Sequence, residues 1–205
     1  MKKIIACCCL LFYPFISLAK EDCKEFEVHW KIYIHKFHAG ELKDIVNLTK
    51  KEVISYYTPS DWIRIFGASE KYRSFVYGNP IVKKEQSKEE SIKWIVQDNI
   101  ARKFNEKEEV VKEIKTGFLP IVDSTVFPYL AVLDQSKNSK IFVLGGKSTH
   151  IANMTVNPNE MKIDVGQNQK VVAKLEDNQW PKEIHFLLGA KKVYVQRTNL
   201  VCTKH

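Results

Sequence analysis

The sequence predicts an α+β protein in which a helical N-terminal half packs on a mainly antiparallel β-meander. The first observation is the alternation of apolar and polar residues over 23–37, which predicts a strand. The second is the helical spacing of apolar residues before residue 117, and the third is the series of short apolar runs and turn residues after it. Separation of helices from strands along a chain is typical of the α+β class, so we expect a single domain over residues 20–205.

The alternating stretch 23–37 is the clearest element in the chain. Its even positions are all apolar and its odd positions are polar or amphipathic. A period of two places alternate side chains on opposite faces of a strand. We therefore expect one face to fill the core; it consists of Phe26, Val28, Trp30, Ile32 and Ile34.

Two short helices are predicted between this strand and residue 67. Thr49 is followed three residues later by Glu52, the spacing of a capping box, which predicts a helix start at Thr49. Thr58 and Pro59 suit the N-cap and first position of a second helix, and Gly67 suits its end. Apolar residues over 42–46 also fall at helical spacing.

The longest helix is predicted over residues 87–104. A second capping box at 87–90 opens it, and charged residues flank one apolar stripe. That stripe consists of Ile92, Ile95, Val96, Ile100 and Phe104. Residues 106–115 fit either a further helical turn or a strand.

Three hairpins are predicted after residue 117. The first pairs residues 127–134 with 141–144, the second pairs 161–165 with 171–175, and the third pairs 184–188 with 193–195. Turn-forming residues stand between the two arms of each hairpin. Short strands at this spacing indicate an antiparallel meander.

The first 19 residues have the pattern of a secretory signal peptide. Lys2 and Lys3 precede an apolar run that contains Pro14 and ends in small residues, so we expect cleavage after Ala19. No later stretch is apolar and long enough to cross a bilayer, so we expect no membrane insertion of the mature form. The expected location is the periplasm, with full secretion as the alternative.

Cleavage after Ala19 would leave two cysteines, Cys23 and Cys202. An even number of cysteines in an oxidising compartment favours a disulfide over a reactive thiol or a metal pair. We expect this bond to tie the N-terminal strand to the C-terminus.

The surplus of positive charge is diffuse. The chain has 32 Lys and Arg residues against 24 Asp and Glu, and the excess is spread along it. Nucleic-acid readers usually use arginine forks on a clustered basic face, so we expect no nucleic-acid partner. A weak attraction to anionic envelope polymers is the alternative use of the lysines.

No catalytic, cofactor or metal site is predicted. Gly145 to Ser148 resemble the end of a phosphate-binding loop, but position 141 is Ile where that loop needs Gly. His35 and His38 are close enough to share a metal, but a zinc site would need a third ligand, such as His150 or His185, brought in by the fold, so we expect no zinc. A hydrolase would have to use carboxylates such as Asp123, or Glu176 with Asp177.

The aromatic stretch 56–77 is the candidate partner-binding region. Tyr and Trp interleaved with Arg dominate contact energy at many protein interfaces. The alternative is that these rings fill the core. The candidate residues are Tyr56, Tyr57, Trp62, Arg64, Tyr72, Arg73 and Tyr77.

These observations favour a secreted or periplasmic non-enzymatic binding protein with a protein partner. Within that class, an immunity-type protein that neutralises a secreted effector fits a small, disulfide-tied envelope protein. One alternative is a hydrolase of cell-envelope polymers, and another is an accessory subunit that docks through an edge strand. A concave pocket with convergent titratable groups would favour the enzyme, and an exposed patch would favour the interaction protein.

Overall fold

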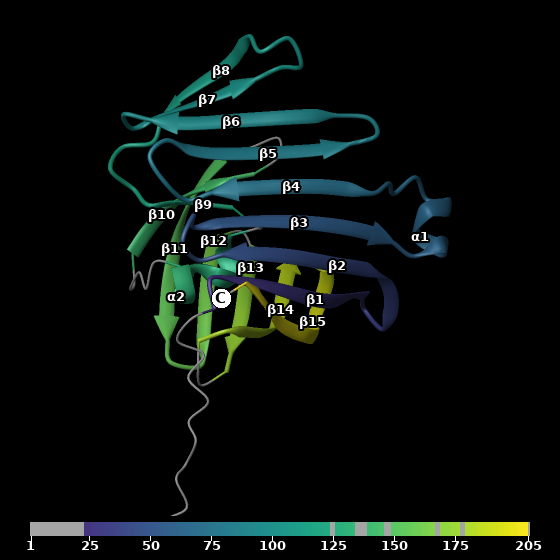
Figure 1. Ribbon diagram of the computed structural model, residues 1–205. Helices are drawn as coiled ribbons and strands as arrows, with labels where there is room; N and C mark the ends of the chain where they lie inside the picture. Colours follow the sequence, from purple (N-terminus) through teal and green to yellow (C-terminus); the bar gives the residue numbers. More distant parts are fainter. Residues whose placement is uncertain are drawn as a thin grey trace, which may run out of the picture.

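The computed structural model describes residues 23–123, 126–133, 139–145, 149–166, 169–176 and 179–204. Almost all of the regular structure is β-strand, and the strands form one sheet of 15 strands (Figure 1). The first eight strands are β1 (Glu25–Ile34), β2 (Phe37–Asn47), β3 (Glu52–Pro59), β4 (Lys71–Val76), β5 (Ile81–Ser87), β6 (Ser91–Gln97), β7 (Ile100–Phe104) and β8 (Val110–Lys115). The remaining seven are β9 (Ile121–Val122), β10 (Ser139–Leu144), β11 (Thr149–Asn157), β12 (Glu160–Gly166), β13 (Gln169–Leu175), β14 (Pro181–Leu188) and β15 (Lys191–Lys204).

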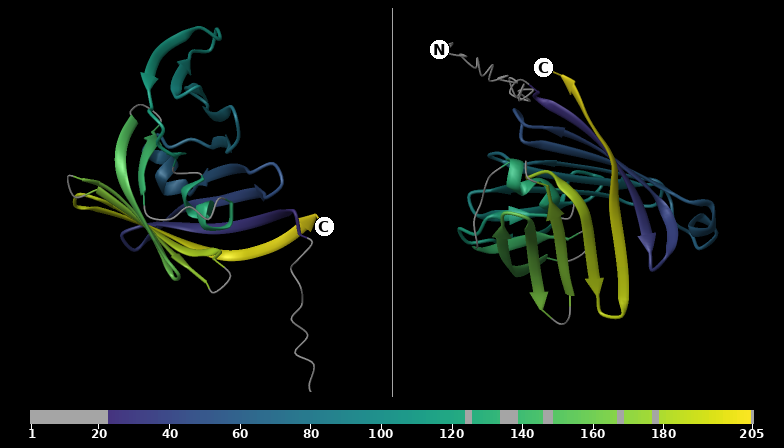
Figure 2. Two further views of the ribbon diagram at one scale, coloured as in Figure 1. Left: turned by 90° about the vertical axis from the view of Figure 1, so that its left-hand side faces the viewer. Right: turned by 90° about the horizontal axis from the view of Figure 1, so that it is seen from below.

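Chain order and sheet order are closely related. From one edge the strands run β8 to β1 in reverse sequence order, and β15 then pairs with β1 and is followed by β14 down to β9. Every neighbouring pair is antiparallel except β9 and β10, which are parallel. β1 therefore joins the N-terminal strands to the C-terminal ones, in the middle of the sheet. The sheet is strongly curled (Figure 2).

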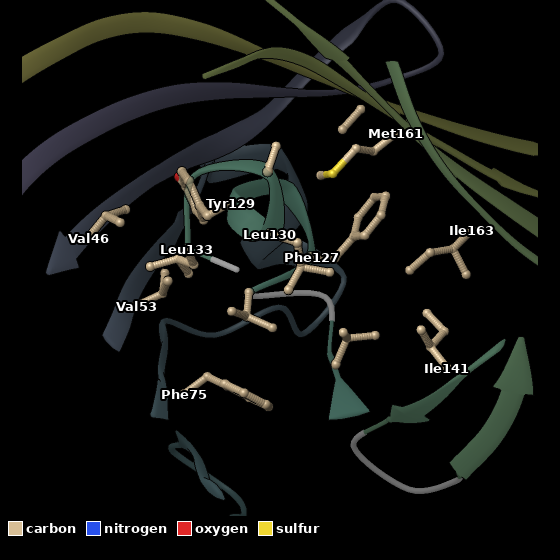
Figure 3. Packing of buried hydrophobic residues seen from close by; sticks show 14 of the residues in the cluster. Val46, Val53, Phe75, Phe127, Tyr129, Leu130, Leu133, Ile141, Met161 and Ile163 are labelled. Atoms are coloured by element: carbon tan, nitrogen blue, oxygen red, sulfur yellow. The ribbon is translucent and has the colours of Figure 1, made fainter. Parts of the chain in front are cut away.

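A short helical segment lies inside the curl. It consists of the 3-10 helix η1 (Phe127–Tyr129) and the helix α2 (Leu130–Leu133). Its buried side chains meet core residues from both halves of the sheet (Figure 3). The labelled residues from the sheet are Val46, Val53, Phe75, Ile141, Met161 and Ile163, and those from the segment are Phe127, Tyr129, Leu130 and Leu133. We call residues 127–133 the plug.

A buried ion pair joins β5 to the segment after β9. The ammonium of Lys83 lies 3.1 Å from an Asp123 carboxylate oxygen and donates a hydrogen bond of 2.9 Å to the carbonyl of Leu144, at the end of β10. Both charged side chains are almost completely buried. Strands from opposite arms of the sheet are thus connected across its interior.

The prediction of an α+β fold with a helical N-terminal half is wrong. Residues 42–46 and 49–57 lie in β2 and β3 and the turn between them, and residues 87–104 form mainly β6 and β7. The supposed stripe of 87–104 breaks at Asp98 and Asn99, which form a tight turn with positive φ angles of 52° and 61°. Ile92, Trp94 and Val96 are then buried on one face of β6 by strand alternation.

One short helix does form near its expected place. The helix α1 (Asp61–Ile65) begins after Ser60, whereas Pro59 is the last residue of β3. Residues 106–115, for which helix and strand were both open, contain the exposed edge strand β8.

The hairpin predictions have mixed outcomes. The second and third hairpins are confirmed as β12–β13 and β14–β15. The first is wrong in its leading arm, because residues 127–133 form the plug, while 141–144 do lie in a strand. The intervening residues 134–138 lie outside the described part of the chain.

The N-terminal strand is confirmed as β1, with Phe26, Val28 and Trp30 buried on one face. Cys23 and Cys202 form a disulfide next to the first residues of β1 and the last of β15. The predicted signal peptide lies outside the described residues. In the part of the chain that the structure describes, no helix has the length and apolar character needed to span a membrane.

Candidate functional site

A cavity of about 270 Å³ lies on the concave face of the sheet. It is enclosed by β14, β15 and β1 on one side, by β2, β3 and β4 on the other, and by Pro128 of the plug. These strands are far apart in sequence and come together because β1 pairs with both β2 and β15.

One wall of the cavity is apolar. Directly opposed residues of antiparallel strands share a face, so the strand register lays the wall out in two rows. The outer row consists of Ile34, Val193 and Phe186. The inner row consists of Ile32, Val195 and Ile184.

The facing wall carries the polar groups. Its outer row consists of Leu42, Tyr57 and Lys71, and its inner row consists of Asp44, Ser55 and Arg73. The cavity is therefore amphipathic across its width, with aliphatic and aromatic side chains facing hydroxyls and charges.

The two rows also define an open and a closed end. The outer rows lie beside the β1–β2 turn, the β14–β15 turn and the connection from β3 through α1 to β4. The inner rows lie toward the plug, where Pro128 and Tyr129 are buried. We call the outer end the mouth and the inner end the floor.

Asp44 is the central polar group of the floor. It is almost completely buried, and its Oδ2 atom accepts hydrogen bonds from the Trp30 indole, at 2.9 Å, and from the Tyr129 hydroxyl. Among the described residues, no donor forms a hydrogen bond of ordinary distance and angle with its Oδ1 atom. Burial raises the pKa of Asp44 to about 6, although the Ser55, Tyr129 and Trp30 donors act against that rise.

Tyr129 responds to the same environment. Burial, and then the Asp44 charge, raises the pKa of its phenol well above the usual value. The phenol therefore stays protonated and acts as a hydrogen-bond donor to Asp44. The plug is thus attached to the floor of the cavity through a polar contact as well as through apolar packing.

Two cations face the cavity and they differ in their pairing. Arg73 forms an ion pair of 3.2 Å with Glu85 on β5. Lys71, nearer the mouth, forms no ion pair within 4.0 Å with any residue that the structure describes. Lys71 is therefore the cation that is best placed to meet an anionic group from solution.

The structure does not bring the seven candidate partner-binding residues together on one surface. Tyr57 and Arg73 line the cavity, whereas Tyr56 and Tyr72 are opposed on the other face of the same strands, with ring centroids 5.4 Å apart. Tyr77 is half-buried against Phe75.

The other two candidates lie at the mouth end. Trp62 is on α1, and Arg64 pairs with Glu70 at 3.2 Å. The proposal that these residues bind a protein therefore concerns four separate places on the molecule.

The carboxylates considered for hydrolysis are occupied elsewhere. Asp123 pairs with Lys83, and Glu176 forms an ion pair of 2.5 Å with Arg197. Asp177 lies outside the described residues, as do Gly146, Lys147 and Ser148 of the loop-like motif.

The histidines do not gather into a candidate metal centre. His35 and His38 lie in and beside the β1–β2 turn. Within the described ranges no group of three or more His, Cys, Asp and Glu side chains is placed to hold a metal. The prediction of no zinc remains one for elemental analysis to test.

Most of the cavity could not be predicted from the sequence. Ile32 and Ile34 were recognised as one apolar face, but their partners on β14 and β15 are fixed only by strand pairing. Asp44 was missed because a carboxylate at an inward position of β2 breaks the alternation between Leu42 and Val46. A charged residue midway between two apolar residues of an otherwise alternating stretch is the signal that would have identified it.

Comparisons with known proteins support the fold. No protein-family model matches the chain, and no curated protein matches it in sequence. Among solved structures, the chain is similar to a β-barrel-like protein of the domain of unknown function DUF1849 from Brucella abortus. The two are 8% identical with a TM-score of 0.56, over 89% of this chain and 99% of that one. At this identity the likeness is evidence for the fold alone, and it agrees with the correction from α+β to an almost all-β architecture.

Proposed function

We propose that the protein is a non-enzymatic binding protein of the periplasm, or a secreted one, that holds an amphipathic small molecule in the cavity. The ligand class is an acyl chain, or an apolar body of similar size, with one acidic group. The observation that carries the proposal is the cavity itself, in which a fully apolar wall faces Lys71 and Arg73.

The apolar wall supplies the driving force for binding. Burying apolar surface contributes roughly 25 cal/mol per Å², so a chain lying along Ile32, Ile184 and Val195 would bind mainly through desolvation. At about 270 Å³ the cavity is near the lower end of ligand sites, which typically measure about 300–1,000 Å³. This size favours a single chain over a lipid with several chains.

The polar wall supplies the preference for an acid. With an apolar tail inside, the head group lies at the mouth beside the Lys71 ammonium and the Tyr57 hydroxyl. A carboxylate or phosphate there gains a charge-assisted hydrogen bond from Lys71, whereas an ammonium head would meet like charge.

The hydrolase alternative finds less support in the cavity. Asp44 is the one carboxylate among the lining residues that the structure describes, and no His or Cys lines it with Asp44. Acid–base hydrolysis needs a second group placed for proton transfer or attack. A buried carboxylate that receives bonds from Trp30 and Tyr129 fits a structural role better.

The proposed role as an accessory subunit has one observation in its favour. β8 is an edge strand, and its Val110 and Val111 side chains are largely exposed. An exposed apolar edge is suited to strand addition by a partner. Val111→Lys should abolish any partner complex formed this way, which cross-linking in the envelope would measure; an unchanged complex would contradict it. The immunity-type role has no comparable observation.

The binding proposal is tested by calorimetric titration with tetradecanoate and with tetradecylammonium. We expect saturable 1:1 binding of the acid and at least tenfold weaker binding of the amine, since one charge-assisted contact is replaced by a like-charge one. Lys71→Glu should reverse much of this preference. Lys84→Glu, an exposed site on β5, is the control with the same charge change and should leave it intact.

A cavity-blocking variant provides the second arm of the test. Val193→Trp places a large ring in the outer row, and we expect it to abolish binding. Val201→Trp makes the same change at an exposed position of the same strand and should bind like the native protein. Equal affinities for the two variants, or equal affinities for acid and amine, would refute the proposal.

A further inference from the structure

We propose that the mouth end of the molecule docks on the surface of an anionic phospholipid bilayer. The docking surface is an apolar cluster of Phe37, Trp62, Ile65 and Phe66, which we call the mouth patch. The inference deepens the proposed function, because docking there would present the cavity mouth to the membrane from which an acyl ligand comes.

The mouth patch is exposed to a degree that the fold does not require. The exposed fractions are 69% for Phe37, 38% for Trp62, 82% for Ile65 and 81% for Phe66. Single exposed apolar residues are ordinary, but a cluster of large ones marks an interaction surface. No residue of α1 is buried, so its apolar side chains do not serve the core.

The cluster is held in place by contacts between two elements. The Trp62 ring lies 6.1 Å from that of Phe37 and 6.3 Å from that of Phe66, both in edge-on geometry. The Trp62 indole and the Ser60 hydroxyl both donate to the His38 carbonyl, at 2.5 and 3.1 Å. α1 is therefore fixed against the β1–β2 turn, and the two lie at the same end of the molecule (Figure 1).

The patch adjoins the cavity mouth along the chain. Phe37 directly follows the β1–β2 turn, and Ile34 before the turn and Ala39 after it both line the cavity. On the other side, α1 lies between Tyr57 and Lys71, which line it too. A surface that covered the patch would face the opening.

The charges at this end favour an anionic surface. The exposed Lys36 lies in the β1–β2 turn, and the exposed Lys191 and Lys192 are the first two residues of β15. These two segments are joined by a backbone hydrogen bond of 3.1 Å from His35 to Lys192. Lys71 adds a fourth cation.

The opposing charges at this end are few. Arg64 and Glu70 neutralise each other in an ion pair of 3.2 Å. The remaining carboxylate on α1 is Asp61. The β5–β6 turn follows Ser87, the strand partner of Lys71, and adds the exposed Lys88, Glu89 and Glu90. Five lysines against three carboxylates still give a net positive rim around an apolar centre.

This combination fits a bilayer surface. Trp and Phe rings reside at the boundary between head groups and acyl chains, and each Lys near an anionic leaflet contributes about 1 kcal/mol. A patch of four side chains is suited to contact at the surface, in keeping with the expectation that the mature form does not insert. A protein partner or a second copy would cover the patch with its own groups, and the experiment distinguishes these outcomes.

The experiment is co-sedimentation of the full mature protein with vesicles of phosphatidylcholine alone or mixed with phosphatidylglycerol. We expect binding to the mixed vesicles that weakens as salt is raised, and little binding to the neutral ones. The double variant Ile65→Ser with Phe66→Ser should lose at least tenfold in affinity. Val110→Ser with Val111→Ser removes two adjacent exposed apolar residues from β8 and should bind like the native protein.

A charge arm tests the lysines. Lys191→Glu with Lys192→Glu should weaken binding on the order of tenfold to a hundredfold, from the contribution of each charge near the surface. Lys50→Glu with Lys51→Glu makes the same change in the β2–β3 turn, at the opposite strand end, and should have little effect. Equal losses in the two charge variants, or no binding to mixed vesicles, would overturn the inference. Self-association of the native protein that the Ile65 and Phe66 variant abolishes would overturn it too, by assigning the patch to a second copy.

Failure of the inference is distinguishable from failure of the proposed function. The Ile65 and Phe66 variant keeps every residue that lines the cavity, so tetradecanoate titration should give the native affinity. Val193→Trp should lose the acid and still sediment with mixed vesicles. If the Ile65 and Phe66 variant and the Val193→Trp variant each lost both tetradecanoate binding and vesicle binding, neither measurement would be specific for its site.

Discussion

Asp44 shows how one buried residue connects the sheet, the plug and the cavity floor. Its Oδ2 atom accepts hydrogen bonds from the indole of Trp30 on β1 and from the hydroxyl of Tyr129 in the plug. The carboxylate therefore connects the plug to the sheet one residue away from Pro128, which lines the cavity.

Asp44 should also make stability depend on pH in a definite direction. Its pKa in the folded protein, about 6, lies above the ordinary value of 3.8. The folded state therefore retains a proton that the unfolded state releases, and this group's contribution to the free energy of unfolding falls as pH rises from about 4 to about 6. The loss amounts to about 3 kcal/mol and is complete above that window.

The test compares urea unfolding of the native protein and Asp44→Asn from pH 4 to pH 7. Asparagine does not titrate and its oxygen can still accept from Trp30 and Tyr129. The free energy of unfolding of the native protein minus that of the variant should thus fall by about 3 kcal/mol as the pH rises from 4 to 7. A difference that stays constant with pH would show that folding leaves the pKa of Asp44 unchanged.

The buried polar residues also explain much of what the sequence could not predict. The apolar face of β1 was readable because every inward position from Phe26 to Ile34 is apolar. On β2 to β5, the inward positions 44, 55 and 83 carry Asp, Ser and Lys, which break the alternation of apolar and polar residues. The apolar residues that remain in these strands then fall at spacings that also fit a helix. The partners of Asp44 and Lys83 lie on other elements of the fold, so nothing local in the sequence distinguishes these residues from surface residues.

At the scale of elements, the β6–β7 turn is the feature of the sequence that indicates strands over residues 87–104 most directly. Asp98 and Asn99 both have positive φ, a conformation that these two residue types tolerate better than most others. Recognising this turn would have divided the supposed helix over 87–104 into a hairpin. The periodicity alone could not, because Ile92, Ile95 and Val96 fit both patterns.

The Lys83–Asp123 pair is predicted to hold the two arms of the sheet together. Lys83→Met should lower the free energy of unfolding by about 3–5 kcal/mol, because it leaves a buried carboxylate without its cation. Lys84→Met changes the next residue of β5, which is exposed, and should cost less than about 0.5 kcal/mol. Chemical denaturation of both variants measures the difference, and equal effects would mean that the pair contributes nothing specific.

The disulfide is predicted to stabilise the central strand pair. Cys23 and Cys202 close a loop with a sequence separation of 179, so the bond restricts the unfolded chain strongly. Changing both cysteines to serine should cost about 2–5 kcal/mol and lower the Tm, with the far-ultraviolet circular dichroism spectrum unchanged. Reduction of the native protein should have the same effect, and an unchanged Tm in both cases would show that the two thiols are not joined in solution.

At the scale of the whole molecule, the cavity is a product of topology. Local patterns predicted β1, the β12–β13 hairpin and the β14–β15 hairpin, which together include the apolar wall. The sequence did not indicate that β15 returns to β1, or that Tyr57 and Lys71 face Val193 across an enclosed space. Those relations follow from pairing between strands separated by more than a hundred residues.

The central claim is that an acidic amphipath lies along this apolar wall. The most direct measurement is nuclear magnetic resonance of methyl-labelled protein with tetradecanoate, which records contacts between ligand methylene protons and protein methyl groups. The account predicts contacts with the methyls of Ile32, Ile184 and Val195, and none with those of Val201 or Ile151, which are exposed outside the cavity. Contacts confined to Ile65 of the mouth patch, or no contacts with the cavity wall, would contradict it.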